Sequence, residues 1–105
     1  MAQFDVFRNP GRQREAIPFV VSLQNRRFDR WATRLVAPLL LRRLAGTAPH
    51  YLAPHFTMAG QEVVLDVFNL ATIPANRLGA VVATLDDEES RGKIIRAIDE
   101  LIGQA

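Results

Sequence analysis

The sequence has 105 residues, of which 49% are hydrophobic and 23% charged, as expected for one compact domain spanning residues 1–105. It contains no cysteine, which excludes a disulfide scaffold, a cysteine-ligated zinc site and a cysteine nucleophile. The net charge of +2 is uneven, because residues 1–43 carry nine arginines and three acids whereas residues 44–105 carry four basic and eight acidic side chains. The basic half favours an acidic partner, a second copy of the chain or nucleic acid, or reflects only a genome that uses arginine often.

The chain begins with a polar segment that has an acid at Asp5 and no apolar run, so we expect no signal peptide. No stretch approaches the roughly 20 apolar residues that a membrane-spanning helix needs. We therefore expect a cytoplasmic protein with no membrane contact.

Five to seven short strands are predicted over residues 3–83. Phe4 and Val6 alternate with Gln3, Asp5 and Phe7, the pattern of a half-buried strand. Further extended segments are predicted at 18–24, 32–41, 52–58, 62–69, 70–74 and 78–82, with a loop at 45–50 and a hairpin turn at 58–61.

Pro38 falls late in the segment 32–41. Because proline cannot donate to a strand ladder, we expect it to bend this strand or to place the strand at a sheet edge.

An amphipathic helix is predicted from Asp87 to Ile102. Asp86 is a good N-cap, with Glu89 at the capping-box spacing. Gly103 follows as the residue that ends the helix. The inward face repeats at helical spacing in Ile94, Ile98, Leu101 and Ile102. An antiparallel sheet followed by one helix is an α+β arrangement.

No credible catalytic or metal-binding set is present in the sequence. His50 and His55 have no further ligands or nucleophile at useful spacing, so we expect structural roles for both. Ser22 and Ser90 lack the context of a nucleophile elbow. The acidic run 86–89 is better explained by helix capping than by acid–base catalysis.

A basic segment with interleaved aromatic residues lies before the third predicted strand. Arg26, Arg27, Arg30 and Arg34 surround Phe28 and Trp31. This pattern favours a protein-binding surface, with nucleic-acid contact and an ordinary solvated face as alternatives. We expect Trp31, the sole tryptophan, to be buried in the core, although tryptophan is also frequent at binding hot spots.

The order of these segments resembles the CcdB family over nearly the whole chain. No single short motif carries the resemblance, but the succession of blocks is specific. The matching blocks are Gln3–Asn9, Pro18–Gln24, Asp29, Ala32–Leu39, then Leu52, Pro54, Phe56 and Gly60, followed by Glu62–Leu65, Leu70–Pro74, Leu78–Gly79, and Ile94, Ala97, Ile98 and Leu101.

The resemblance implies an SH3-like, partly open antiparallel barrel with a small second sheet and one C-terminal helix. It implies a homodimeric toxin of a type II toxin–antitoxin pair, with no cofactor, metal or catalytic residues. The toxin would bind the A subunit of DNA gyrase and trap the cleaved-DNA complex. An acidic, partly disordered antitoxin would neutralise it, and the pair would repress its own operon, so that operator DNA is bound only through the antitoxin complex.

Carried over by position, the resemblance assigns the gyrase-binding surface to two segments. The best-known members end in Trp-Gly-Ile, whereas this chain ends in Ile102-Gly103-Gln104-Ala105. The implied gyrase-binding residues are Asn25, Arg26, Arg27, Phe28, Asp99, Ile102, Gly103, Gln104 and Ala105.

Two alternatives remain open at this point. RNA endonuclease toxins of the MazF type have a similar barrel, and Arg14 or His55 would then act on the scissile phosphate. A non-toxic homologue that only binds an antitoxin or operator DNA is the other alternative.

Overall fold

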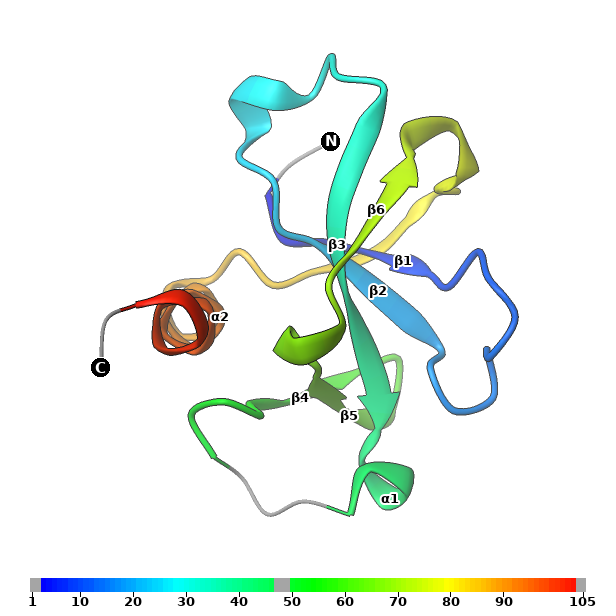
Figure 1. Cartoon of the computed structure of the whole chain (residues 1–105). Helices are drawn as coiled ribbons and strands as arrows, with labels where there is room; N and C mark the ends of the chain where they lie inside the picture. Colours follow the sequence, from blue (N-terminus) through cyan, green and yellow to red (C-terminus); the bar gives the residue numbers. More distant parts are fainter. Residues whose placement is uncertain (1–2, 47–49, 104–105) are drawn as a thin grey trace.

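A computed structural model describes residues 3–46 and 50–103 of the chain. Over these residues it contains an antiparallel sheet and a C-terminal helix, which confirms the predicted α+β class (Figure 1). The strands are β1 (Asp5–Arg8), β2 (Phe19–Ser22), β3 (Thr33–Leu41), β4 (His55–Met58), β5 (Gln61–Leu65), β6 (Ala71–Pro74) and β7 (Val81–Thr84). The helices are α1 (Arg42–Ala45) and α2 (Glu88–Ile102), with single 3-10 turns η1 (Arg26–Phe28), η2 (Val67–Asn69) and η3 (Ala75–Arg77).

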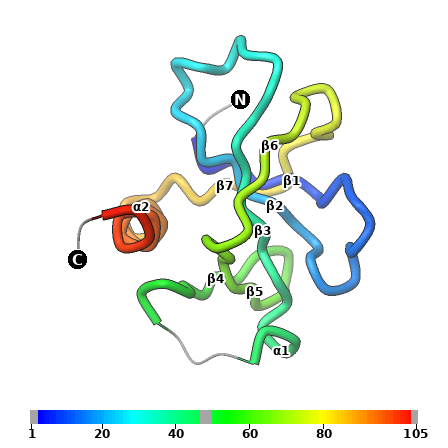
Figure 2. Tube along the Cα trace, viewed as in Figure 1, coloured from blue at the N-terminus to red at the C-terminus, as the bar shows by residue number. Residues whose placement is uncertain are grey.

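The sheet curls into a half-barrel whose strand order is β4-β5-β3-β2-β1-β7, and every pair is antiparallel. β6 lies off this path and pairs with the first half of β3. The expected small second sheet is therefore joined to the main sheet through β3, and the described strands form one seven-stranded sheet. Figure 2 shows the long β3 strand at the centre of the fold, with the other strands on either side of it.

Pro38 lies in the central strand of this sheet, so its expected placement at a sheet edge is wrong. β3 pairs with β2 along one side, while its other side pairs first with β6 and then with β5. The carbonyl of Pro38 accepts from the Asp66 amide at 3.0 Å. In an antiparallel sheet, the nitrogen and the carbonyl of one residue point to the same neighbouring strand. The Pro38 nitrogen, which carries no hydrogen, therefore points to the junction between β6 and β5, and no hydrogen bond to β2 is lost.

β1 is buried on both faces, so the predicted half-buried pattern is wrong. Phe4 and Val6 belong to the main core, as expected, but Phe7 packs into a second cluster on the opposite face. That cluster also contains Leu78, which reaches the sheet from the segment after η3. The second face is covered by a part of the chain far away in sequence, which the local pattern does not reveal.

The predicted hairpin joins β4 to β5, with Met58 opposite Gln61. Ala59 and Gly60 both have positive φ angles, 52° and 76°, as a two-residue turn of the twisted hairpin type requires. The segment predicted as one strand over 62–69 ends at Leu65. Asp66 then accepts from the Phe68 amide at 2.9 Å and turns the chain into η2.

Helix α2 begins one residue later than its predicted cap. Asp87, not Asp86, is the N-cap, and its carboxylate accepts from the Ser90 amide at 3.0 Å. The helix ends before Gly103 as predicted, and a Cβ at this position would lie 2.5 Å from the Asp99 carbonyl oxygen. Within residues 3–46 and 50–103, neither α1 nor α2 has the length and hydrophobicity that a membrane-spanning helix requires.

We predict that Asp87→Ala lowers the melting temperature and that this effect depends on pH. The hydrogen bond from Ser90 lowers the pKa of the Asp87 carboxyl. The cap therefore stabilises the fold above the ordinary carboxyl pKa of 3.8 and stops doing so as the pH falls through the lowered value. Thermal unfolding of both proteins from pH 7 to pH 2 measures this effect. A melting-temperature difference that is the same at all pH values would contradict the role of Asp87 as the N-cap. An equal decrease in Asp86→Ala would contradict it as well.

The main core lies between the concave face of the sheet and α2 (Figure 1). The predicted inward face of the helix is confirmed for Ile94, which is fully buried together with Ala97, and for Ile98 and Leu101, which pack against the same cluster. The predicted inward position of Ile102 is wrong, because this side chain is exposed at the end of the helix. Other members of this core include Phe4, Val6, Phe19, Val21, Leu39, Val63, Leu65 and Val67.

Candidate functional site

The connection between β2 and β3 is ordered by its own hydrogen bonds. Asn25 caps η1, accepting from the Arg27 amide at 3.0 Å. The side chain of Gln24 spans the loop, donating to the Phe28 carbonyl at 3.0 Å and accepting from the Leu35 amide at 3.2 Å. The predicted binding residues Asn25, Arg26, Arg27 and Phe28 are therefore held together as an exposed turn.

Arg34 is the support of this connection and is only 5% exposed. Its guanidinium donates to the carbonyls of Asp29, Trp31 and Thr33. Its predicted place in the exposed basic patch is therefore wrong. The alternation of side chains along β3 is the signal that would have placed Arg34 inside. The side chains of Arg34 and Val36 are buried, while those of Thr33 and Leu35 are exposed.

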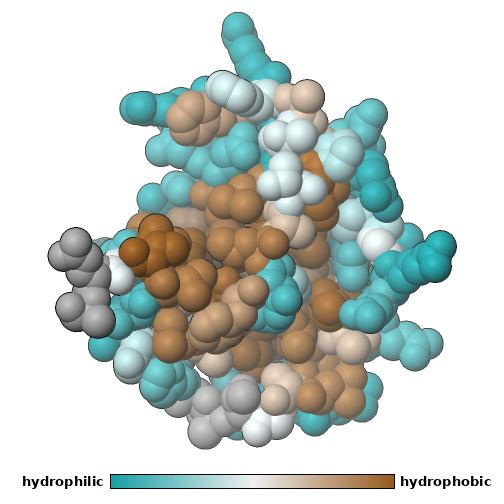
Figure 3. All heavy atoms as spheres, viewed as in Figure 1, coloured by the Kyte–Doolittle hydropathy of each residue, from teal (hydrophilic) through white to brown (hydrophobic). Residues whose placement is uncertain are grey.

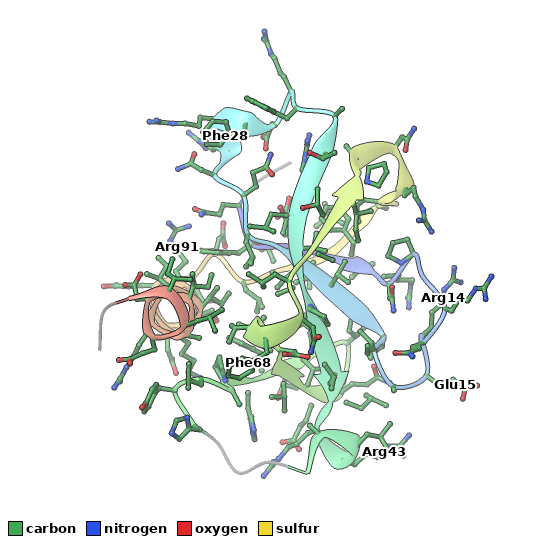
Figure 4. All side chains as sticks on the ribbon, viewed as in Figure 1. Arg14, Glu15, Phe28, Arg43, Phe68 and Arg91 are labelled. Carbon is green, nitrogen blue, oxygen red and sulfur yellow. The ribbon has the colours of Figure 1, made fainter. Side chains whose placement is uncertain are left out.

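Phe28 and Trp31 form an edge-to-face pair with ring centroids 6.0 Å apart. Trp31 is 64% exposed and Phe28 is 39% exposed, so the expected burial of Trp31 in the core is wrong. Trp31 precedes β3 and lies in the loop, where no layer of the fold covers it. Figure 4 shows Phe28 on this loop, among side chains that end in nitrogen atoms.

Arg91 of helix α2, which the sequence alone does not single out, lies beside this loop. Its guanidinium donates to the Gln3 side chain at 3.4 Å and lies 5.0 Å from the Phe4 ring centroid. A pocket of about 330 Å³ is lined by Gln3, Asn25, Arg26, Asp86 and Arg91. Figure 4 shows Arg91 between the loop and the helix, so the first turns of α2 adjoin the turn that carries Asn25.

One face of α2 continues from Arg91 to the end of the helix. At 100° per residue, Arg91, Ile95, Asp99 and Ile102 fall on the same side, and the last three are exposed. At 1.5 Å per residue, this face is about 17 Å long. We name Asn25–Phe28 and this helix face together the loop–helix strip. It joins the two segments predicted to contact gyrase; Gln104 and Ala105 lie outside the described residues.

Apolar side chains gather where the end of α2 meets η2, and Figure 3 shows them as one brown area. Phe68 is 66% exposed and Ile102 is 73% exposed, while Ile98 and Leu101 are partly buried against the core. We name these four residues the apolar patch. Exposed apolar side chains on two neighbouring elements are typical of a protein interface.

The residues of the RNA endonuclease alternative are not brought together. His55 lies on β4, which β5 and β3 separate from β2, while Arg14 lies in the loop before β2 and donates to the Gly11 carbonyl at 3.0 Å. Burial, followed by the positive charge of Arg42, lowers the pKa of His55. His50 accepts from the Leu52 amide at 3.2 Å, which is a structural role. Over residues 3–46 and 50–103, no three histidine, aspartate or glutamate side chains converge as a metal site would require.

Comparison with known proteins identifies the family. The family model described as CcdB protein matches residues 3–103. No curated protein matches the chain. Since the match covers nearly the whole length, the chain belongs to the CcdB family, whose members are non-enzymatic toxins of type II toxin–antitoxin systems that poison DNA gyrase and are neutralised by an antitoxin.

Proposed function

We propose that this chain is a single domain over residues 1–105 that acts in the cytoplasm as a homodimer and binds the A subunit of DNA gyrase through the loop–helix strip. Within the strip, we assign gyrase contacts to Asn25, Arg26, Arg27 and Phe28 of the loop and to Asp99 and Ile102 of α2. We assign Gly103, Gln104 and Ala105 to the same contact. Binding to the cleaved-DNA complex keeps the break open, and an acidic antitoxin competes with this action. Operator DNA is bound only by the toxin–antitoxin complex.

The continuity of the strip is the observation that carries this proposal. Asn25 and Arg26 share a pocket with Arg91, and the same helix face leads from Arg91 to Ile102. Two segments far apart in the sequence therefore present one surface to one partner. The exposed Ile102, 73% accessible, supplies an apolar anchor at the position where the best-known members carry their terminal aromatic segment.

We predict that Ile102→Lys weakens gyrase poisoning at least about tenfold, because the apolar contact that gyrase would bury is replaced by a charge that must be desolvated on binding. Glu100→Lys is the matched control, since Glu100 is also exposed but lies on the opposite side of α2. The readout is the concentration of protein at which purified gyrase accumulates linear DNA. Equal potency of the two variants would contradict the role of the strip.

The apolar patch supports the homodimer. A two-fold axis beside Phe68 would bury Phe68, Ile98 and Leu101 against their copies and leave Ile102 at the edge of the interface, free to contact gyrase, and such an interface is self-complementary. It would also place the two helix ends side by side, so that the strips of both protomers would face gyrase together.

We predict that Phe68→Glu converts the dimer into a monomer, because it places a carboxylate opposite its own copy inside an apolar contact. Val81→Glu is the control, since Val81 is 48% exposed on the distant strand β7. Sedimentation equilibrium over a range of protein concentrations measures the change. A dimer of unaltered affinity in Phe68→Glu would place the interface elsewhere.

A further inference from the structure

We infer that the β2–β3 connection carries an anchor site for an acidic protein segment. One apolar side chain of that segment enters the pocket that Phe28 and Trp31 line with Gln24 and Thr33, and the carboxylates of the segment meet Arg26, Arg27 and Arg30. The inference rests on the proposed function in one respect, since it assigns this segment to the antitoxin that opposes the toxin.

The pocket has the dimensions of a single side-chain site. It measures about 220 Å³ and is lined by Gln24, Phe28, Trp31 and Thr33. Sites that hold whole small molecules are larger, about 300–1,000 Å³. A lining of two aromatic and two polar residues matches the pockets that take one anchor residue of a protein partner.

The walls of this pocket are held in place before anything binds. The Trp31 amide donates to the Phe28 carbonyl at 3.0 Å, and Arg34 holds the carbonyls on both sides of the turn. The amide of Gln24 supports the same turn from the end of β2. An occupant therefore meets an aromatic pair carried by an ordered backbone, and little binding free energy is lost in ordering the loop.

The charge around the pocket selects an acidic occupant. Residues 25–34 contain four arginines and one aspartate, a net charge of +3, and Arg26, Arg27 and Arg30 are exposed. Arginine pairs with carboxylates through two parallel hydrogen bonds, so these arginines select a carboxylate by its geometry as well as by its charge.

A peptide fits this site better than nucleic acid does. The acidic run Asp86–Glu89 begins beside the loop, since Asp86 lines a pocket together with Asn25 and Arg26. A duplex needs several phosphate contacts along an extended surface and would meet these four acids next to the arginines. A short peptide can pair with the arginines and end before the acids.

Trp31 allows the site to be observed directly, because it is the only tryptophan in the chain. The probes are three short synthetic peptides without tryptophan: a glutamate-rich peptide with two leucines, the same peptide with serine for leucine, and a lysine-rich version with the leucines kept. A short DNA duplex is the fourth probe. Only the acidic leucine peptide is expected to shift the Trp31 emission to shorter wavelength, with saturation below about 1 mM.

Charge reversal then tests the arginines around the pocket. The double variant Arg27→Glu and Arg30→Glu is expected to weaken the peptide at least about tenfold. Arg14→Glu together with Arg12→Glu is the matched control, because both arginines are exposed in the loop between β1 and β2. Raising the salt concentration is expected to weaken binding to the unmodified protein and to leave the double variant nearly unaffected.

No emission shift with the acidic leucine peptide, an equal shift with the lysine or serine peptide, or a larger shift with the duplex would overturn the inference. The gyrase assay is independent of this result. A protein that poisons gyrase but ignores the acidic peptide refutes the anchor site alone. A protein that binds the peptide through Arg27 and Arg30 but leaves gyrase unaffected refutes the proposed function and retains the site.

Discussion

Replacing Ile94 by alanine is expected to lower the free energy of unfolding by about 3 kcal/mol. Ile94 is fully buried on the inner face of α2 and belongs to the main core. Its removal leaves a cavity between the helix and the sheet, and the surrounding strands are tied into one sheet that cannot collapse freely into the space. Urea unfolding at a fixed protein concentration measures the change, since dimerisation would otherwise contribute to the apparent stability.

The neighbouring residue provides an unusually close control. Ile95 has the same side chain one position further along the same helix, but it is 43% exposed. Ile95→Ala should change the free energy of unfolding by less than about 1 kcal/mol. Equal losses in the two variants would mean that α2 is not docked on the sheet by the face described.

Replacing Arg34 by alanine is expected to lower the free energy of unfolding by about 3 kcal/mol, a large effect for an arginine. The change removes the donors of three carbonyls in and beside the β2–β3 connection and leaves space where the guanidinium lies. Trp31 emission should also move to longer wavelength, because the aromatic pair loses its support. Urea unfolding followed by circular dichroism and by fluorescence measures both changes.

Arg30→Ala is the control for Arg34, since Arg30 lies in the same connection but is exposed. It should change stability by less than about 0.5 kcal/mol. Arg34→Lys should recover only part of the loss, because an ammonium group cannot reach three separate carbonyls in the way that the planar guanidinium does. Similar stability of Arg34→Ala and Arg30→Ala would show that the buried guanidinium does not hold the loop.

The elements of this fold could be predicted where their signals are local. The 3.6-residue repeat of Ile94, Ile98 and Leu101 predicts α2, and the turn residues Ala59 and Gly60 lie within the predicted hairpin. The central place of β3 in the sheet could not be predicted. A central strand accommodates Pro38 because β6 and β5 share one side of β3 and the proline lies where one partner strand gives way to the other. The cap is predicted one residue early because Asp86 and Asp87 are adjacent and of the same type.

The candidate site could be predicted in part. The basic and aromatic composition of residues 25–34 indicates a binding surface, and Phe28 and Arg27 are exposed there. Trp31 and Arg34 exchange their predicted places, the tryptophan being exposed and the arginine buried, because residue type alone favours the opposite arrangement. Arg91 could not be found from the sequence because its contact with Gln3 joins two residues 88 positions apart in the chain.

The central claim is that the protein acts on gyrase by surface contact and has no bond-breaking groups of its own. The most direct test incubates the purified protein with supercoiled DNA and with RNA, in the presence and in the absence of purified gyrase. We predict that linear DNA accumulates only when gyrase and the protein are both present, and that the RNA stays intact. Cleavage of either nucleic acid without gyrase, or no change in gyrase activity at any protein concentration, would contradict the claim.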